Sequence, residues 1–242
     1  AKDHSDSAIS GQGFNLSSTL EDWVSIFDAD NGNNEEMIFD VQGSSLSGQG
    51  TAVSNLFTPR NAGLSGSGFG GNNKLKPLFI NNMIDKFDNR YQNSIITQYE
   101  TATRQFNINP WSTGYIPTNL ETGNTLGTLW QVWTAKYIDT EATTEYTSRQ
   151  NWHVIRLADV YLMRAEASAE ILSDPSAANP DINILRSRVG MTDIDYSSMS
   201  MQDFREEILR ERAVELYMEG HRFFDLTRFG VYDEYCRFVY GA

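Results

Sequence analysis

One stretch, residues 152–172, limits the fold of this chain more than any other. The spacing of its apolar residues predicts a long helix, and those residues surround most of the helix circumference. A helix that is apolar on nearly all sides packs against neighbours on more than one side. We therefore expect a core of packed helices in the last third of the chain. The apolar positions are Ile155, Leu157, Ala158, Val160, Tyr161, Leu162, Ala165 and Ala169.

Two further helices are predicted to follow. Residues 179–190 begin with Asn-Pro, which is typical of a helix start, and end in a glycine, which is typical of the position after a helix. Residues 200–218 begin with Ser200, which with Asp203 can cap a helix, and Gly220 follows the predicted end. The starts of the three helices are too unevenly spaced to indicate an internal repeat.

The first 150 residues have a different character, with short elements and one long irregular segment. Residues 42–76 are rich in Gly, Ser and Asn, and a loop of this length is usually functional or disordered. We therefore expect a loop-rich, ligand-facing part over 1–150 and a helical scaffold over 151–242. The short elements predicted in the first part are a helix over 18–27 capped by Ser18 and Glu21, a strand over 37–41, a helix from Pro77 to Phe87 that closes at 88–90, and strands over 94–99, 103–108 and 129–138.

Charge and composition exclude several classes of protein. The chain carries 19 Lys and Arg against 32 Asp and Glu, a net charge of −13. Nucleic-acid binding and basic attachment to an anionic membrane both need an excess of Lys and Arg, so neither is expected. The single cysteine, Cys236, excludes a fold held by internal disulfides. No apolar run is long enough for a transmembrane helix, and residues 1–10 do not resemble a signal peptide.

Several motif-like patterns fail the requirements of the sites that they resemble. The glycines of 66–71 lack the leading strand and following helix of a dinucleotide-binding loop. Residues 28–39 differ from a calcium-binding loop, with Gly at position 5 and Phe at position 12. The three histidines have no zinc-ligand spacing, and no serine stands in a nucleophile elbow. We therefore expect no catalytic residue, metal or cofactor, although a glycosidase carboxylate pair cannot be identified by counting acidic residues.

The densest charged segment is 208–230, where charges alternate with large apolar residues. Such charges are expected to be partly buried, and buried charges need partners. We favour a structural network that holds a helix against the next segment over a catalytic site. Its predicted members are Arg212, Glu215, Glu219, Arg222, Asp225 and Arg228.

Aromatic residues near two polar loops are candidates for binding a sugar. Aromatic rings can stack on the C–H faces of a sugar, while short polar side chains bind its hydroxyls. The alternative for each ring is packing against a neighbouring loop. We favour the loops 43–76 and 111–130 as the binding region. The candidate residues are Phe57, Phe69, Asn72, Asn73, Trp111, Tyr115 and Trp130, with Asn61 and Asn119 nearby.

Five segments, taken in order, resemble motifs of the SusD/RagB family. Residues 152–167, WHVIRLADVYLMRAEA, are similar to its RLAEVYLMRAEA segment. Residues 205–230 carry the family's spaced ER, EL, EG, R and DL pattern, in REEILRERAVELYMEGHRFFDLTRFG. The shorter matches are ILRSRVGM at 184–191, NNEEMIFDVQ at 33–42 and FDNR at 87–90.

The resemblance implies a mostly α (α+β) fold, with a scaffold of tetratricopeptide-like helix pairs and a loop-rich region that carries short strands. It implies a non-catalytic lipoprotein on the outer membrane of Bacteroidota, which captures a glycan for a SusC-like TonB-dependent transporter. The family's first half, its lipidated cysteine and its closing Pro-Ile-Pro segment have no counterpart here. The chain is therefore expected to be a piece of such a protein. A glycoside hydrolase or other secreted enzyme, and a protein–protein scaffold, remain alternatives.

Overall fold

The structure is a computed structural model that describes residues 1–242 except 12, 47, 66–70, 76–78, 81–83, 103, 110–113, 120–131 and 241–242. The chain divides into two compact units. The helical unit contains Ala1–Ile26, Asn33–Asp40 and His153–Ala242, and the loop-rich unit contains Phe27–Gly32 and Val41–Trp152. This division differs from a single boundary at residue 150, because two N-terminal segments pack with the C-terminal helices.

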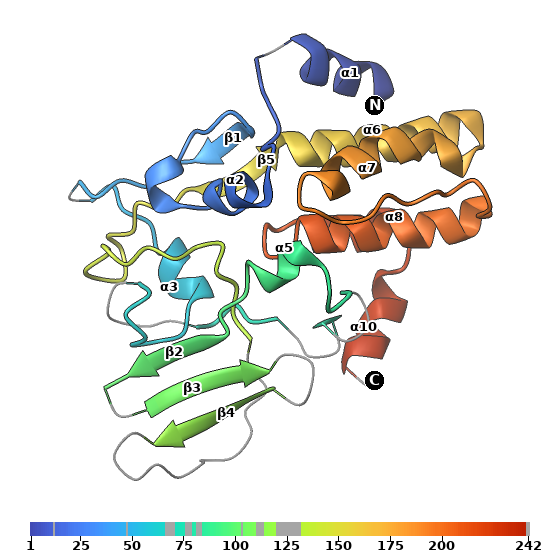
Figure 1. The fold of residues 1–242 in the computed structure, drawn as a ribbon. Helices are drawn as coiled ribbons and strands as arrows, with labels where there is room; N and C mark the ends of the chain where they lie inside the picture. The colour runs from blue at the N-terminus through green and yellow to red at the C-terminus, as the bar shows by residue number, and fades with distance from the viewer. Residues whose placement is uncertain are drawn as a thin grey trace. The chain divides into compact units, whose positions relative to one another are not determined.

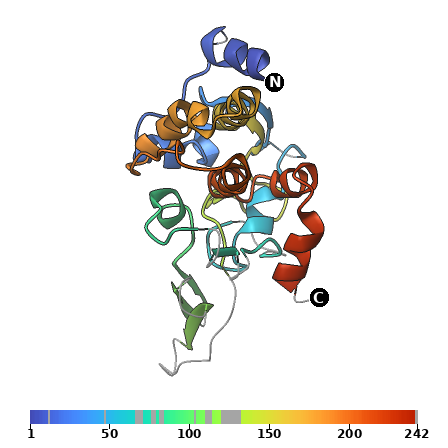
Figure 2. The same cartoon turned by 90° about the vertical axis from the view of Figure 1, so that its right-hand side faces the viewer.

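The helical unit is built on three helices that lie side by side (Figure 1; Figure 2). They are α6 (Leu157–Leu172), α7 (Asn179–Ser187) and α8 (Met201–Glu215). A short 3-10 turn, Pro175–Ala178, joins α6 to α7 and closes an antiparallel helix pair. The expectation of a mostly α fold with tetratricopeptide-like helix pairs is confirmed. The remaining helices of this unit in the described residues are α1 (Lys2–Gly11), α2 (Leu20–Ser25), α9 (Arg222–Arg228) and α10 (Tyr232–Tyr240).

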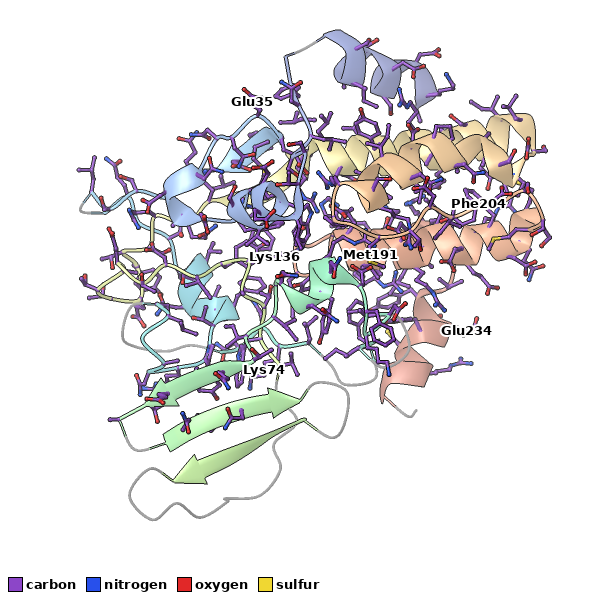
Figure 3. All side chains as sticks on the ribbon, in the orientation of Figure 1. Glu35, Lys74, Lys136, Met191, Phe204 and Glu234 are labelled. Atoms are coloured by element: carbon purple, nitrogen blue, oxygen red, sulfur yellow. The ribbon has the colours of Figure 1, made fainter. Side chains whose placement is uncertain are left out.

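Small residues on α6 let the helices approach closely. Ala158, Ala165 and Ala169 are fully buried, and none of them carries a side chain that would hold α7 and α8 away. Larger apolar residues of the neighbouring helices fill the space between, among them Ile182 of α7 and Phe204 of α8, which is labelled in Figure 3. The helix that is apolar on most sides thus packs against α1, α7 and α8, although Met163, Ile171 and Leu172 stay exposed.

The predicted start of the long helix is wrong by five residues. Residues Trp152–Arg156 form strand β5, which pairs with β1 (Met37–Val41), and α6 begins only at Leu157. The β-branched residues Val154 and Ile155 suit a strand as well as the edge of an apolar helical pattern. The pairing partner lies more than a hundred residues away, so periodicity could not reveal it. The predicted strand over 37–41 is confirmed.

The caps predicted for the other helices are confirmed in part, and α8 ends at Glu215, three residues before the predicted end at Met218. Ser200 caps α8 by accepting a hydrogen bond from the backbone N–H of Asp203, at 3.2 Å. Gly190 follows α7 with φ of +72°, the left-handed conformation that suits glycine. In α2 the cap is shifted by one residue, because Thr19 and not Ser18 accepts the N–H bond, from Asp22.

The loop-rich unit carries short helices and one antiparallel sheet in the order β2-β3-β4 (Figure 1). Strands β2 (Gln98–Thr101) and β3 (Arg104–Asn109) overlap the predicted ones at 94–99 and 103–108. Strand β4 (Gly114–Asn119) lies where a loop was expected. The described part of 129–138 makes only isolated bridges, at Val132 and Thr134. The short helices are η1 (Ala29–Asn31), α3 (Val53–Phe57) and α5 (Asn89–Gln92).

The predicted helix over 77–87 is only partly described: residues 79–80 are helical, residues 84–87 are not, and 77, 78 and 81–83 lie outside the described residues. Its expected end at 88–90 is instead the start of α5, because Asp88 caps that helix by accepting the N–H of Arg90 at 2.9 Å. The Asp88 carboxylate also receives the buried guanidinium of Arg90, at 2.7 Å. Among the described residues, no helix is long and apolar enough to cross a membrane.

Candidate functional site

A buried network of charges occupies the centre of the helical unit. Arg156 is the last residue of β5, directly before α6, and is 1 % exposed. Its guanidinium donates to Glu36 at 2.8 Å, to Glu215 at 2.7 Å and to Glu219 at 2.7 Å. Its contact with three carboxylates raises the pKa of Arg156 well above its ordinary value, although burial acts in the opposite direction.

A second arginine completes this network. Arg188, after the end of α7, donates to Glu36 and to Glu215, each at 2.7 Å. The indole N–H of Trp23 on α2 also donates to Glu215, at 3.2 Å. Burial disfavours the charge of Glu36, but the two guanidinium groups outweigh burial and hold the pKa of its carboxyl below the ordinary value. The network thus joins segments from both ends of the chain.

A separate cluster links α6, α8 and α9. Arg212 forms ion pairs with Asp225 at 2.7 Å and with Asp159 at 2.8 Å. Arg228 also contacts Asp225, at 3.1 Å, and forms a two-pronged pair with Glu166. Because each carboxylate here is engaged by a guanidinium, the arrangement can cross-link helices and offers no obvious acid or base to a substrate.

The six charged residues predicted from the segment 208–230 therefore fall into different places. Glu215 and Glu219 join the first network, while Arg212, Asp225 and Arg228 form the second cluster. Arg222 stands apart, donating to the carbonyl of Leu209 at 3.0 Å and stacking over a tyrosine ring. The partners of these residues were not predicted, although all of them lie within the quoted family motifs: Glu36, Arg156, Asp159, Glu166 and Arg188.

The candidate sugar-binding residues belong to the loop-rich unit, and one of them needs correction. Phe57, at the end of α3, is only 6 % exposed, and its ring packs against Tyr137 at 4.7 Å and Trp152 at 5.6 Å between centroids. A ring that is buried in this way has no surface for a sugar. The sequence placed Phe57 in a polar loop, but three aromatic residues from distant segments form a small core there.

The other candidates are placed only in part. Asn72 is exposed and Asn73 is half-buried, in a segment whose backbone bonds to residues of α3. Tyr115 stands in β4 opposite Ile108 of β3. Phe69, Trp111 and Trp130 lie outside the described residues.

One face of the β2-β3-β4 sheet carries paired polar side chains that the sequence analysis did not single out. Gln98 donates from its amide to Asn107, directly opposite it on β3, at 3.0 Å. Gln105 donates to Glu100, its own partner in the register, at 2.8 Å. These cross-strand bonds leave further amide and carboxylate positions that can accept or donate to hydroxyl groups. Among the described residues, no group of three His, Cys, Asp or Glu could hold a metal ion.

Comparison with known proteins places the chain. The sequence pattern that defines the SusD family matches residues 2–240, nearly the whole chain. The chain belongs to the SusD family. Over 96 residues it is 40 % identical to the SusD-like protein P25 of Formosa agariphila, a match that covers 39 % of this chain and 18 % of that protein. Over 80 residues it is 41 % identical to the starch-binding protein SusD of Bacteroides thetaiotaomicron, covering 33 % of this chain and 13 % of that one.

Solved structures share the fold of this SusD-family chain. A SusD superfamily protein from Parabacteroides distasonis matches with a TM-score of 0.71 and 23 % identity, over 94 % of this chain and 45 % of its own. A laminarin-binding SusD-like protein matches with a TM-score of 0.63 and 24 % identity, over 93 % and 48 %. Surface glycan-binding protein A of Bacteroides thetaiotaomicron, in complex with laminarihexaose, matches with a TM-score of 0.61 and 17 % identity, over 95 % and 49 %. The chain therefore spans about half the length of these structures.

Proposed function

We propose that this protein captures an uncharged glycan at the surface of the outer membrane and delivers it to a SusC-like TonB-dependent transporter. The observation that carries the proposal is the SusD-family match over residues 2–240, together with relatives that are named for binding starch and laminarin. The net charge of −13 supports an uncharged ligand, because the field of the protein repels polyanions and acts little on neutral sugars.

We propose a binding role without catalysis. Glycoside hydrolysis needs two carboxyl groups that flank the substrate, one of them protonated and the other available as nucleophile or base. The carboxylates of the two charged clusters described above are instead engaged by arginines. This supports the helical unit as a scaffold that holds the ligand-binding loops.

A panel of neutral hexasaccharides tests both statements at once. Isothermal titration with laminarihexaose, cellohexaose and maltohexaose is expected to show saturable binding of at least one of them. New reducing ends are expected to stay at the level of the blank during long incubation with the same sugars. Turnover would establish the glycoside hydrolase alternative. Absence of binding to any glycan, with retained affinity for a transporter, would favour the protein–protein scaffold.

The ligand-facing loops are proposed to be 43–76 and 111–130. Asn72 is exposed and Asn73 is half-buried, so both can reach a hydroxyl group, and Phe69, Trp111, Tyr115 and Trp130 remain proposed ring contacts. Alanine substitution of Phe69, Trp111 or Trp130 is expected to weaken hexasaccharide binding by up to about two orders of magnitude, if a sugar stacks about as strongly as a base does. Three variants that bind like the parent chain would place the site elsewhere.

Delivery to a transporter can be tested separately from glycan binding. We expect this protein to co-purify in detergent with a SusC-like transporter when the two are produced together in a Bacteroidota host. A substitution in the helical unit that preserves glycan binding but abolishes co-purification with the transporter would mean that the two interactions use different surfaces.

A further inference from the structure

The two strands at the ends of the segment 41–152 pair with each other. Strand β1 ends at Val41 and strand β5 begins at Trp152 (Figure 1). The carboxylate of Asp40 and the imidazole of His153, the residues of the helical unit on either side of this segment, are hydrogen-bonded at 3.0 Å. Because its two ends meet, the segment is placed as an insertion in the helical unit. An insertion of this kind can lose its structure without separating the strands that carry it.

The helical unit has a hydrophobic core of its own, formed mainly by α6, α7 and α8. The buried network at its centre is also internal to it. The guanidinium of Arg156 donates to Glu36 and to Glu219, which both belong to the same unit. The contacts that hold α6 to the segment around β1 therefore lie within one unit.

The loop-rich unit has its own buried aromatic clusters. The rings of Phe57, Tyr137 and Trp152 pack on one another, with centroids 4.7 to 5.6 Å apart. In the sheet, the ring of Tyr99 on β2 stacks on Phe106 of β3, with centroids 4.4 Å apart. Aromatic packing therefore holds this unit, whereas helix packing holds the other.

Asp139 connects separate segments of the loop-rich unit. Its buried carboxylate accepts the Ser148 hydroxyl at 3.1 Å and the backbone N–H of Arg149 at 2.7 Å. Its own backbone N–H donates to the Ser54 hydroxyl at 3.1 Å. Asp139 thus has a role in this unit that corresponds to the role of Glu215 in the helical unit.

We propose that the loop-rich unit is an inserted, separately cooperative unit, which unfolds and refolds while the helical unit stays folded. Parts of a protein with their own buried contacts open in separate steps, and ligand-binding parts are typically the less stable ones. The proposed ligand loops, 43–76 and 111–130, belong to the loop-rich unit. A bound glycan therefore stabilises this unit alone, a consequence that rests on the proposed function.

Hydrogen exchange of the full chain, followed by mass spectrometry across a urea series, gives an unfolding midpoint for each unit. Asp139→Ala is expected to lower the midpoint of the loop-rich unit by roughly 0.5 M urea or more and to leave that of the helical unit unchanged. Glu215→Ala is expected to do the reverse. Arg149→Ala and Ser200→Ala, which remove less, are a second pair of variants with the same two expectations and keep the test decisive if one of the first pair fails to fold.

A folded variant that lowers the midpoints of both units, or that leaves the midpoint of its own unit unchanged, would overturn the inference. A hexasaccharide of the same panel that the parent chain binds is expected to raise the midpoint of the loop-rich unit alone, and an equal rise in both units would contradict the separation. Because the variants are compared without ligand, a parent chain that binds none of the sugars would contradict the proposed glycan capture and not this inference.

Discussion

Glu215 accepts hydrogen bonds from three side chains that come from separate segments of the helical unit: Trp23, Arg156 and Arg188. Glu215 and these three partners are all buried, so water cannot readily replace the hydrogen bonds that are lost with the carboxylate. Two guanidinium groups would then lose one of their few carboxylates, and an unpaired buried charge is more costly than the pair is stabilising.

We therefore expect Glu215→Ala to lower the free energy of unfolding by about 2–4 kcal/mol. Urea unfolding followed by circular dichroism measures it. Glu206→Ala on the same helix is the control, because Glu206 is exposed, and it is expected to change stability by about 0.5 kcal/mol or less. Unchanged stability of Glu215→Ala combined with lost glycan binding would mean that this cluster is a ligand site.

Glu36 predicts how stability depends on pH. Arg188 and Arg156 outweigh burial and lower the pKa of its carboxyl in the folded protein. A lowered folded pKa gives stability that is complete above the unfolded value of about 4.3 and is lost as the pH falls through the folded value. The denaturant midpoint of unfolding is therefore expected to decrease as the pH is lowered below about 4. Glu36→Gln should be less stable near neutrality, and its stability should depend less on acidic pH. Glu35→Gln, at the exposed neighbour labelled in Figure 3, is the control and should show neither change.

At the scale of elements, α8 depends on both its first residue and its neighbours. Ser200 caps it, and Phe204 and Ile208 of the same helix are fully buried against α6 and α7. Capping satisfies a backbone N–H that would otherwise lack a partner, while packing supplies most of the stability of a helix of this length.

Ser200→Ala is expected to destabilise the protein by about 1 kcal/mol, and Ser200→Thr to recover most of that loss. Thermal unfolding of the two variants beside the parent measures the difference. If alanine and threonine lowered the melting temperature equally, the effect would come from something other than the capping hydrogen bond.

At the scale of the whole molecule, the negative charge decides which ligands can approach. A neutral sugar gains or loses little from the net charge of −13, whereas an anionic glycan is repelled over a distance set by the salt concentration. Shape and local hydrogen bonds must then provide the affinity.

The affinity for a neutral hexasaccharide is therefore expected to change by less than about twofold between roughly 50 and 500 mM salt. At the lower salt concentration, an anionic oligosaccharide of the same length is expected to bind at least about tenfold more weakly than the neutral sugar. Calorimetry at both salt concentrations compares them. A steep salt dependence for the neutral sugar would point to charged groups in the site.

The sequence by itself determined the features that depend on neighbouring residues. The apolar spacing of α6, the Ser200 cap and the glycine after α7 each follow from interactions within a few positions. The ordered motifs identified the SusD family, since its scaffold residues recur at short spacings within single helices. The excess of acidic residues likewise predicts, without a structure, that the chain does not bind nucleic acid.

Only the tertiary structure decided what depends on residues far apart in the chain. Arg156 reaches Glu36 across 120 positions, and Arg188 reaches the same carboxylate across 152. Strand β5 replaced the expected helix start because a distant strand pairs with it, and Phe57 left the candidate site because distant rings cover it. Local periodicity carries no information on such partners, because backbone pairing and burial are free energies of contacts that folding alone creates.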